Sequence, residues 1–345
     1  MDDLKVLITA CGTPGFIPLF KQLKKIKERD IHIIGTDMDM NASGKFYVDK
    51  FYQVPPASNT DYQQQMIDII KKENPDIILP ESSLEIEKIS LISYLYPEYK
   101  FMVNDDHVIK FIENKHELYE YLSYVIPENI PEYYAPKNIS DFRYFAEKLG
   151  YPDKTICFKP FIGKGSRGFR IIDENIDSYD ILFNQRPGKN IYMKINEFAD
   201  IVYDKEFPDI LLNEFVEGTE YDCMVLANED SEALLTTVKV RKKSKYGLSW
   251  EGELVDSPEH VELCEKISKA LRLQYCNGIQ FIGDKLIEVN PRLSTYIYDN
   301  HHFCEPYIAM KMALGELTDD EVRSYQDKIP IGRKFIRTTD QIFYD

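Results

Sequence analysis

The segment Gly163–Gly168 combines glycines and cations in a way that suits phosphate binding. It matches G-x-G-x-x-G, but a dinucleotide fingerprint needs a strand before the loop and a helix after it. Here Phe169–Ile172 follows with a strand pattern, so we expect a β-hairpin flap and neither a dinucleotide loop nor a Walker loop. With Lys159, Lys164 and Arg167, positive charge lies beside backbone N–H donors, as a polyphosphate site requires. A flexible surface hairpin is the alternative for the glycines alone.

A second group of polar residues lies on a predicted hairpin near residues 279–292. Because strand side chains alternate between faces, Glu288 and Asn290 should point the same way, and Ile287 should point to the core. If the turn is the three residues Gly283–Lys285, Gln280 lies directly across from Glu288. Three oxygen donors then converge, which is how Mg²⁺ is usually held when phosphates complete its coordination. An edge hairpin with a solvated polar face is the alternative.

Two neighbouring features extend these groups. Pro291 can end the strand, which lets Arg292 reach a phosphoryl oxygen beside the metal. The stretch Leu212–Tyr221 joins two strand patterns through a glycine and carries three glutamates. Carboxylates after a strand are usually only solubilising, so this stretch is a weak signal by itself.

The first hundred residues must position loops around these groups. Short apolar runs at Val6–Ile8, Ile31–Gly35 and Ile77–Leu79 alternate with helical patterns, for example at Tyr62–Glu73. This alternation predicts right-handed βαβ crossovers and a parallel sheet. Functional loops should then lie at the carboxyl ends of the strands, namely Ala10–Gly15, Thr36–Met40 and Pro80–Glu85.

The rest of the chain has a different pattern. Helical patterns cover residues 105–124, and a proline-rich connection follows at residues 126–136, so we place a domain boundary near residue 105. Beyond it, strand patterns recur as far as Asn290, with helices predicted at residues 141–149 and 259–271. The second part should therefore be mostly antiparallel sheet with attached helices.

Composition limits the partners and the location. The 345 residues suffice for two or three domains. The net charge of −16 repels polyanions, so neither nucleic acid nor an anionic membrane is an expected partner. No stretch approaches the ~20 apolar residues that span a bilayer. The acidic start, together with six cysteines that form no C-x-x-C, predicts a soluble protein with free thiols in the cytoplasm.

The order of the polar residues resembles that of the ATP-grasp enzymes. The chain shows Lys115, then Lys159-Pro160 with the glycine loop, Glu214-x-Val216-x-Gly218-x-Glu220, Gln280, and Glu288-x-Asn290-Pro291-Arg292. It looks most like single-module ligases similar to one half of the carbamoyl phosphate synthetase large subunit. The resemblance covers nearly the whole chain.

The resemblance implies a fold that is α/β in its first part and α+β in the rest. Residues 1–105 would form a Rossmann-like pre-ATP-grasp domain with a parallel sheet. A two-subdomain ATP-grasp fold would follow. Residues 106–210 would form its first subdomain with the glycine-rich flap, and residues 211–345 its second, with the metal site and a C-terminal extension.

The resemblance also implies the roles of individual residues. Two lysines, the flap and the adenine and ribose contacts would bind ATP, namely Lys115, Lys159, Gly163, Lys164, Gly165, Ser166, Gly168, Glu214, Phe215, Val216 and Glu220. Mg²⁺, which Mn²⁺ can replace, would be held by Gln280, Glu288 and Asn290. Arg292 and Lys159 would be catalytic, with Arg292 stabilising the transferring phosphoryl group.

The function implied is an ATP-dependent ligase that activates a carboxylate as an acyl phosphate and joins it to an amine. The sequence suits this chemistry because it offers cations and metal ligands, and phosphoryl transfer needs mainly positioning and charge neutralisation. The partners would be small-molecule substrates, and a homodimer is compatible with the resemblance. Three alternatives stay open: a carbamoyl phosphate synthetase component, a nicotinamide-dependent enzyme using Gly12–Gly15 and Asp37, and a non-catalytic nucleotide-binding module.

The substrate pocket is the least defined part of the sequence. A cationic cluster in residues 239–251 can bind a carboxylate or form a solvated face; its members are Arg241, Lys243 and Lys245. Glu81 or Glu85, in an N-terminal loop, can receive an amine. Beyond the predicted strand that carries Glu288 and Asn290, four more residues either contact the acceptor substrate or have a structural role. They are Tyr296, Tyr298, His301 and His302.

Overall fold

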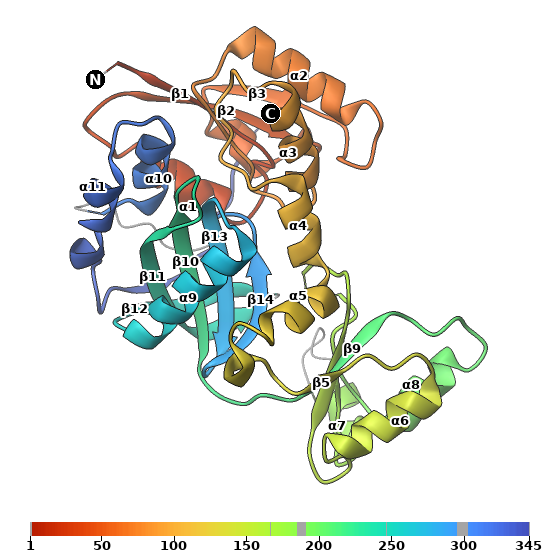
Figure 1. The fold of residues 1–345 in the computed structure, drawn as a ribbon. Helices are drawn as coiled ribbons and strands as arrows, with labels where there is room; N and C mark the ends of the chain where they lie inside the picture. Colours follow the sequence, from red (N-terminus) through yellow and green to blue (C-terminus); the bar gives the residue numbers. More distant parts are fainter. Residues whose placement is uncertain (1, 166, 185–190, 246, 295–302, 345) are drawn as a thin grey trace.

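The structure is a computed structural model that describes residues 2–165, 167–184, 191–245, 247–294 and 303–344 (Figure 1). Its N-terminal part holds a four-stranded parallel sheet in the order β3-β2-β1-β4. These strands are β1 (Leu4–Ile8), β2 (Ile31–Asp37), β3 (Lys50–Gln53) and β4 (Ile77–Leu79). The predicted parallel sheet is therefore confirmed.

Helices cover both faces of this sheet because the strand residues that point to each face are mostly apolar. Val6 and Ile8 pack in one core with helix α1 (Phe16–Leu23), and Leu7 packs in another with α2 (Tyr62–Glu73) and α3 (Ile86–Leu95). The carboxyl ends of β1, β2 and β4 consequently carry the loops that face the rest of the molecule.

Two short helices connect this sheet to a second one. They are α4 (Asp106–Glu113) and α5 (Lys115–Leu122), with the side chain of Asn114 capping α5; a 3₁₀ turn follows at Pro127–Asn129. The second sheet has five strands in the order β5-β9-β6-β7-β8, all antiparallel except the β7–β8 pair. Its strands are β5 (Tyr133–Tyr134), β6 (Ile156–Pro160), β7 (Arg170–Ile172), β8 (Tyr192–Met193) and β9 (Ile210–Glu214). Three helices accompany it: α6 (Ile139–Lys148), α7 (Ser178–Phe183) and α8 (Ile195–Val202).

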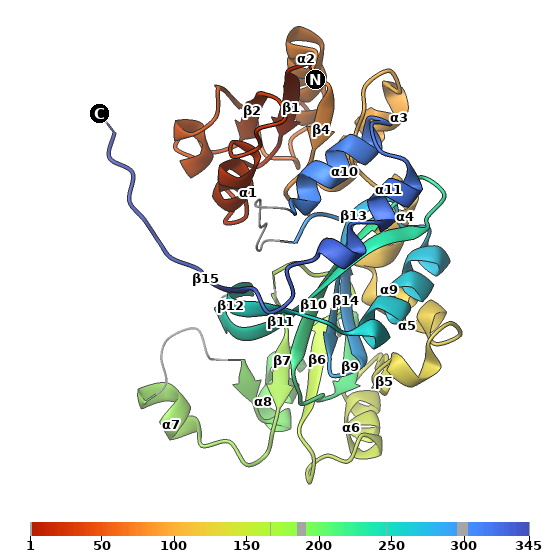
Figure 2. The same ribbon diagram turned by 90° about the vertical axis from the view of Figure 1, so that its left-hand side faces the viewer.

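The third sheet has six antiparallel strands in the order β14-β13-β10-β11-β12-β15. They are β10 (Glu220–Ala227), β11 (Ala233–Lys245), β12 (Leu248–Val255), β13 (Tyr275–Ile282), β14 (Lys285–Asn290) and β15 (Lys334–Ile336). Helix α9 (Pro258–Leu271) packs on one face, whereas α10 (Glu305–Ala313) and α1 share a core with the opposite face. Helix α11 (Asp319–Arg323) and a 3₁₀ turn at Gln326–Lys328 precede β15. Figure 2 shows α10 lying between this sheet and the N-terminal domain.

The predicted domain boundaries at residues 105 and 210 stay predictions. Strand β9 begins at the second boundary and pairs with β6. The first strand of the six-stranded sheet along the chain is β10. Within the residues that the structure describes, no helix has both the length and the apolar character needed to cross a membrane.

Candidate functional site

The glycine-rich segment joins two antiparallel strands, as predicted. Cys157 on β6 pairs with Ile171 on β7, so the loop is the tip of a hairpin. Gly168 adopts φ +78°, and a Cβ there would lie 2.5 Å from Cγ of Pro160. Only glycine accepts that conformation and contact without strain. Arg167 is exposed on the flap, and Ser166 lies outside the described residues.

Lys159 reaches from the flap strand to the six-stranded sheet. Its Nζ donates to the phenolic oxygen of Tyr119 at 2.8 Å and to the carbonyl oxygen of Ile287 at 2.9 Å. Burial lowers the pKa of Lys159 to about 8; the nearby charge of Lys115 lowers it too, whereas Glu288 opposes the shift. The lysine therefore lies beside the predicted metal strand.

Lys115 and Lys164 link the flap to helices α5 and α4. Lys115, the first residue of α5, donates to the carbonyl oxygen of Gly163 at 2.9 Å. Burial lowers its pKa, and Glu288 again opposes the shift. Lys164 forms an ion pair with Glu113 at 2.6 Å. Three lysines thus gather at the flap, where the five-stranded sheet meets the six-stranded sheet.

The hairpin β13–β14 differs from the prediction in its turn. The three-residue turn Gly283–Lys285 was wrong, because Lys285 already pairs with Ile282 and leaves a two-residue turn. A bulge follows at Ile287, so Gln280 still pairs with Glu288. Ile287 consequently does not enter the core; Leu286 and Val289 do. At the bulge, the carbonyl oxygen of Ile287 accepts hydrogen bonds from Lys159 and Tyr119.

The predicted metal ligands lie on one face of this hairpin. Gln280 and Glu288 are direct cross-strand partners, and Nδ2 of Asn290 donates to Oε1 of Glu288 at 3.0 Å. No group of three His, Cys, Asp or Glu side chains forms a metal cluster in the described part of the chain. The donors are instead one carboxylate and two amides, which fits Mg²⁺ only if phosphate oxygens complete the coordination.

Arg292 faces the N-terminal domain. Its Nε donates to Oγ of Ser83 at 2.8 Å, and Lys164 donates to the carbonyl oxygen of the same serine. The loop after β4 therefore joins the flap to the residue predicted to stabilise the phosphoryl group. Glu81, two residues earlier, is 2% exposed, and neither carboxylate oxygen has a hydrogen-bond partner among the described residues. Burial raises the pKa of Glu81 to about 7, and the charge of Arg292 opposes the shift.

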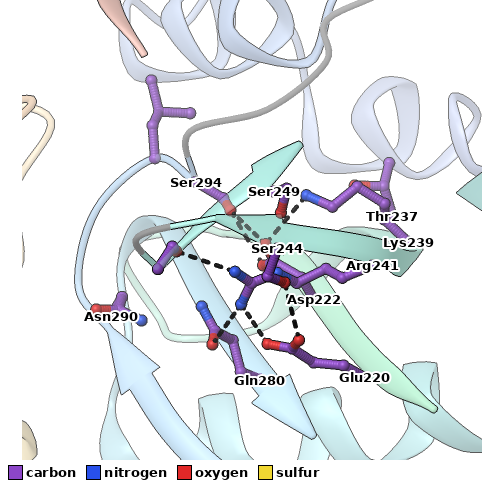
Figure 3. A network of polar contacts seen from close by, with 12 residues as sticks. Glu220, Asp222, Thr237, Lys239, Arg241, Ser244, Ser249, Gln280, Asn290 and Ser294 are labelled. Carbon is purple, nitrogen blue, oxygen red and sulfur yellow. Dashed lines mark hydrogen bonds and ion pairs between the residues drawn. The ribbon is translucent and has the colours of Figure 1, made fainter. Parts of the chain in front are cut away.

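Glu220 contacts Arg241, which also contacts Gln280, one of the three predicted metal ligands. Nη1 of Arg241 donates to a carboxylate oxygen of Glu220 and, at 3.2 Å, to Oε1 of Gln280 (Figure 3). Oγ of Ser244 donates to the other oxygen of Glu220 at 3.2 Å. Burial raises the pKa of Glu220, although Arg241 opposes the shift.

A buried ion pair between Asp222 and Lys239 lies beside Gln280 on the same sheet. Asp222 pairs with Gln280 on one side and with Lys239 on the other. Nζ of Lys239 lies 3.0 Å from Oδ2 of Asp222, and Oγ of Ser294 donates to the same carboxylate (Figure 3). Because Ser294 closely follows Arg292, this network fixes the chain directly after the predicted catalytic residue.

The predicted adenine contacts lie at the end of β9 and in the loop that joins the five-stranded sheet to the six-stranded sheet. Oε1 of Glu214 accepts from the backbone N–H of Glu132 at 3.0 Å, and the Glu214 N–H donates to the Glu132 carbonyl. The Glu214 side chain is therefore held at the edge of β5. Phe215 and Val216 are half-buried in the loop that follows.

Two family profiles match the chain. Residues 206–331 match one described as "ATP-grasp in the biosynthetic pathway with Ter operon", and residues 6–94 match one described as "PylC-like, N-terminal domain". The chain is a member of the ATP-grasp superfamily. Its predicted likeness to one half of the carbamoyl phosphate synthetase large subunit stays a prediction.

One bacterial protein is similar in sequence to part of this chain. The formate-dependent phosphoribosylglycinamide formyltransferase of Wolinella succinogenes is 25% identical over 216 residues, which cover 61% of this chain and 51% of that protein. This ATP-grasp chain therefore matches about half the length of that relative.

Solved structures show the same architecture. The biotin carboxylase domain dimer of Hydrogenobacter thermophilus 2-oxoglutarate carboxylase, solved with MgADP, ADP and bicarbonate, matches with a TM-score of 0.60 at 17% identity, covering 91% of this chain and 70% of that one. N5-carboxyaminoimidazole synthetase from Staphylococcus aureus matches with a TM-score of 0.58 at 13% identity, covering 84% and 70%. At these identities the likeness concerns the fold.

Some site residues of this ATP-grasp protein carry no signal in the sequence. Tyr119 and Ser83 carried no motif, and only the fold brings them to Lys159 and Arg292. In the cationic cluster of β11, Arg241 is buried at the site, whereas Lys243 and Lys245 are exposed. Strand alternation alone places all three on one face, so it could not have separated Arg241 from the two lysines; the register of β11 against β12 shifts directly after Arg241. Tyr296, Tyr298, His301 and His302 lie outside the described residues.

Proposed function

We propose that this ATP-grasp protein is an ATP- and Mg²⁺-dependent ligase that activates a carboxylate as an acyl phosphate and joins it to an amine. The contact between Lys159 Nζ and the Ile287 carbonyl carries the proposal. It brings a cation of the flap strand next to Glu288, the carboxylate of the candidate metal set. Phosphoryl transfer requires this combination of cations and oxygen ligands around one site.

Different side chains would bind different parts of the magnesium–ATP complex. Lys115, Lys159 and the backbone N–H groups of the flap would bind the phosphates of ATP. Gln280, Glu288 and Asn290 would hold Mg²⁺ or Mn²⁺, which when bound neutralises phosphate charge. The segment Glu214–Val216 would contact adenine, and Glu220 would hold the ribose hydroxyls.

The proposed reaction has two steps. An oxygen of the substrate carboxylate attacks the γ-phosphorus of ATP, the bond from that phosphorus to the bridging oxygen breaks, and ADP leaves. The amine then attacks the acyl carbon, phosphate leaves, and the amine loses a proton. Arg292 would stabilise charge on the transferring phosphoryl group, since Ser83 and the Leu293 carbonyl hold its guanidinium in place.

The relative from Wolinella succinogenes supports this reaction class. The Wolinella succinogenes protein is named for dependence on formate, which is a carboxylate, and for transfer to a glycinamide. The substrates of the present chain, a homodimeric assembly and a cytoplasmic location stay predictions. All six cysteines are free thiols, which agrees with that location.

Trapping of the acyl phosphate tests the proposal. Hydroxylamine, a strong nucleophile, should convert the intermediate into a hydroxamate when the protein, MgATP and a panel of carboxylates are mixed without the natural amine. ADP release without any hydroxamate would favour a kinase or an ATPase. Nucleotide binding without turnover across the panel would favour a non-catalytic module.

A further inference from the structure

We infer that Arg241 is a nucleotide contact, which binds the α- and β-phosphates of ADP or ATP from the side of the site opposite Lys115 and Lys159. This inference rests on the proposed function. Neither the family motif nor the flap assigns a role to Arg241.

Arg241 lies between two parts of the candidate site. It comes from β11, whereas Glu220 comes from β10 and Gln280 from β13, so three strands present these side chains on one face of the sheet (Figure 3). Nη1 contacts both Glu220 and Gln280, and Nη2 donates to the Gly247 carbonyl at 2.9 Å. One guanidinium therefore spans the distance between the proposed ribose contact and the proposed metal ligand.

A bound nucleotide must cross this distance. If Glu220 holds the ribose and Gln280 shares the metal beside the terminal phosphate, the α- and β-phosphates lie between these two residues. Arg241 is the cation that contacts both. A guanidinium forms charge-assisted, often paired hydrogen bonds with phosphate oxygens, and burial strengthens them.

The guanidinium of Arg241 has a donor group that can bind an additional acceptor. Its side chain is 5% exposed, yet its Nε has no hydrogen-bond partner among the described residues. The oxygen of Gln280 cannot serve fully both as a metal ligand and as an acceptor for this cation. When the metal binds, Nη1 should exchange Gln280 for a phosphate oxygen, while the Gly247 carbonyl keeps the guanidinium in position.

Binding measurements with ADP and adenosine test the inference. Both ligands would occupy the adenine and ribose contacts, but only ADP carries phosphates. By titration calorimetry with Mg²⁺ present, Arg241→Gln should weaken ADP binding roughly ten- to hundredfold, the loss expected for a charged hydrogen-bonding group. Adenosine affinity should change less than about twofold, since Gln can still donate to Glu220. Arg241→Lys, which keeps the charge needed beside Glu220 for folding, should show an intermediate loss.

A neighbouring cation provides the control. Lys242 is exposed and pairs with Glu253, so Lys242→Gln should leave both affinities unchanged. Unchanged or tighter ADP binding by Arg241→Gln would overturn the inference, and tighter binding would show that Arg241 competes with the nucleotide. An equal loss for ADP and adenosine would also overturn it. If the wild-type protein binds neither ligand, the proposed function itself fails.

Discussion

The ammonium of Lys159 on β6 lies 2.9 Å from the carbonyl oxygen of Ile287 on β14, so one hydrogen bond links the five-stranded sheet to the six-stranded sheet. Ile287 is the bulged residue beside Glu288, and the bulge leaves its carbonyl without a ladder partner. The bond brings the charge of Lys159 to the candidate metal strand. It also means that a change in the packing of the two sheets would move cation and metal ligands relative to one another.

Lys159→Met should weaken ATP binding at least tenfold while the protein still folds. The substitution removes a charge-assisted phosphate contact but keeps most of the aliphatic stem. Titration calorimetry measures the affinity, and thermal unfolding checks the fold. Lys137→Met, at an exposed lysine, is the matched control and should bind ATP normally. Normal affinity in a folded Lys159→Met protein would refute the phosphate site.

ATP affinity should decrease as the pH rises above about 8. Only the protonated form of Lys159 attracts phosphate, and burial has lowered its pKa to about 8. Above that pH the free protein must take up a proton on binding, which costs up to about tenfold in affinity per pH unit. Titrations between pH 7 and 10 would show the decrease, and Lys159→Met should lack it.

Glu288→Gln should abolish Mg²⁺-supported turnover while ADP still binds. The substitution keeps the shape but removes the only anionic ligand of the proposed metal set. ADP release with MgATP measures turnover, and calorimetry measures ADP binding. Glu265→Gln, on the exposed face of α9, should behave like the wild type. Ordinary turnover in Glu288→Gln would mean that the hairpin is a solvated edge.

Arg292→Ala should slow hydroxamate formation roughly 10²–10³-fold, the usual cost of removing one donor that stabilises transition-state charge. ATP binding should weaken much less, because Lys115 and Lys159 remain. Comparing the initial rate of hydroxamate formation with the ATP affinity separates the two effects. Equal losses in both would assign Arg292 to binding.

Glu81→Gln should stabilise the protein at pH 8 and have little effect below about pH 4.5. Burial raises the pKa of Glu81 from 4.5 to about 7 in the folded state, so unfolding releases a proton between these values and stability falls as the pH rises through them. The full loss is about 3 kcal/mol. Chemical denaturation at pH 4.5 and pH 8 measures it. Exposed Glu98→Gln is the control, and the same pH dependence in Glu81→Gln and wild type would contradict the assignment.

Local sequence determined the elements and the pairs within them. The flap hairpin and the pairing of Gln280 with Glu288 followed from strand alternation and glycine positions, because both depend on residues close together in the chain. The helix Tyr62–Glu73 was also predicted with its observed bounds, since its apolar spacing is regular. The predicted length of the turn between β13 and β14 was wrong, because a two-residue turn followed by a bulge gives the same pairing of Gln280 with Glu288 as a three-residue turn.

Only the tertiary structure decided which of these elements meet. Ser83 lies 209 residues from Arg292, and Tyr119 lies 40 residues from Lys159, so no local pattern could pair them. The burial of Arg241 depends on β10 lying beside β11 and on β13 lying beside β10, whereas in sequence it is one of four cations within residues 241–245. Sequence thus determined the chemistry available along each strand, and the packing of three sheets determined which charges were removed from water and brought together.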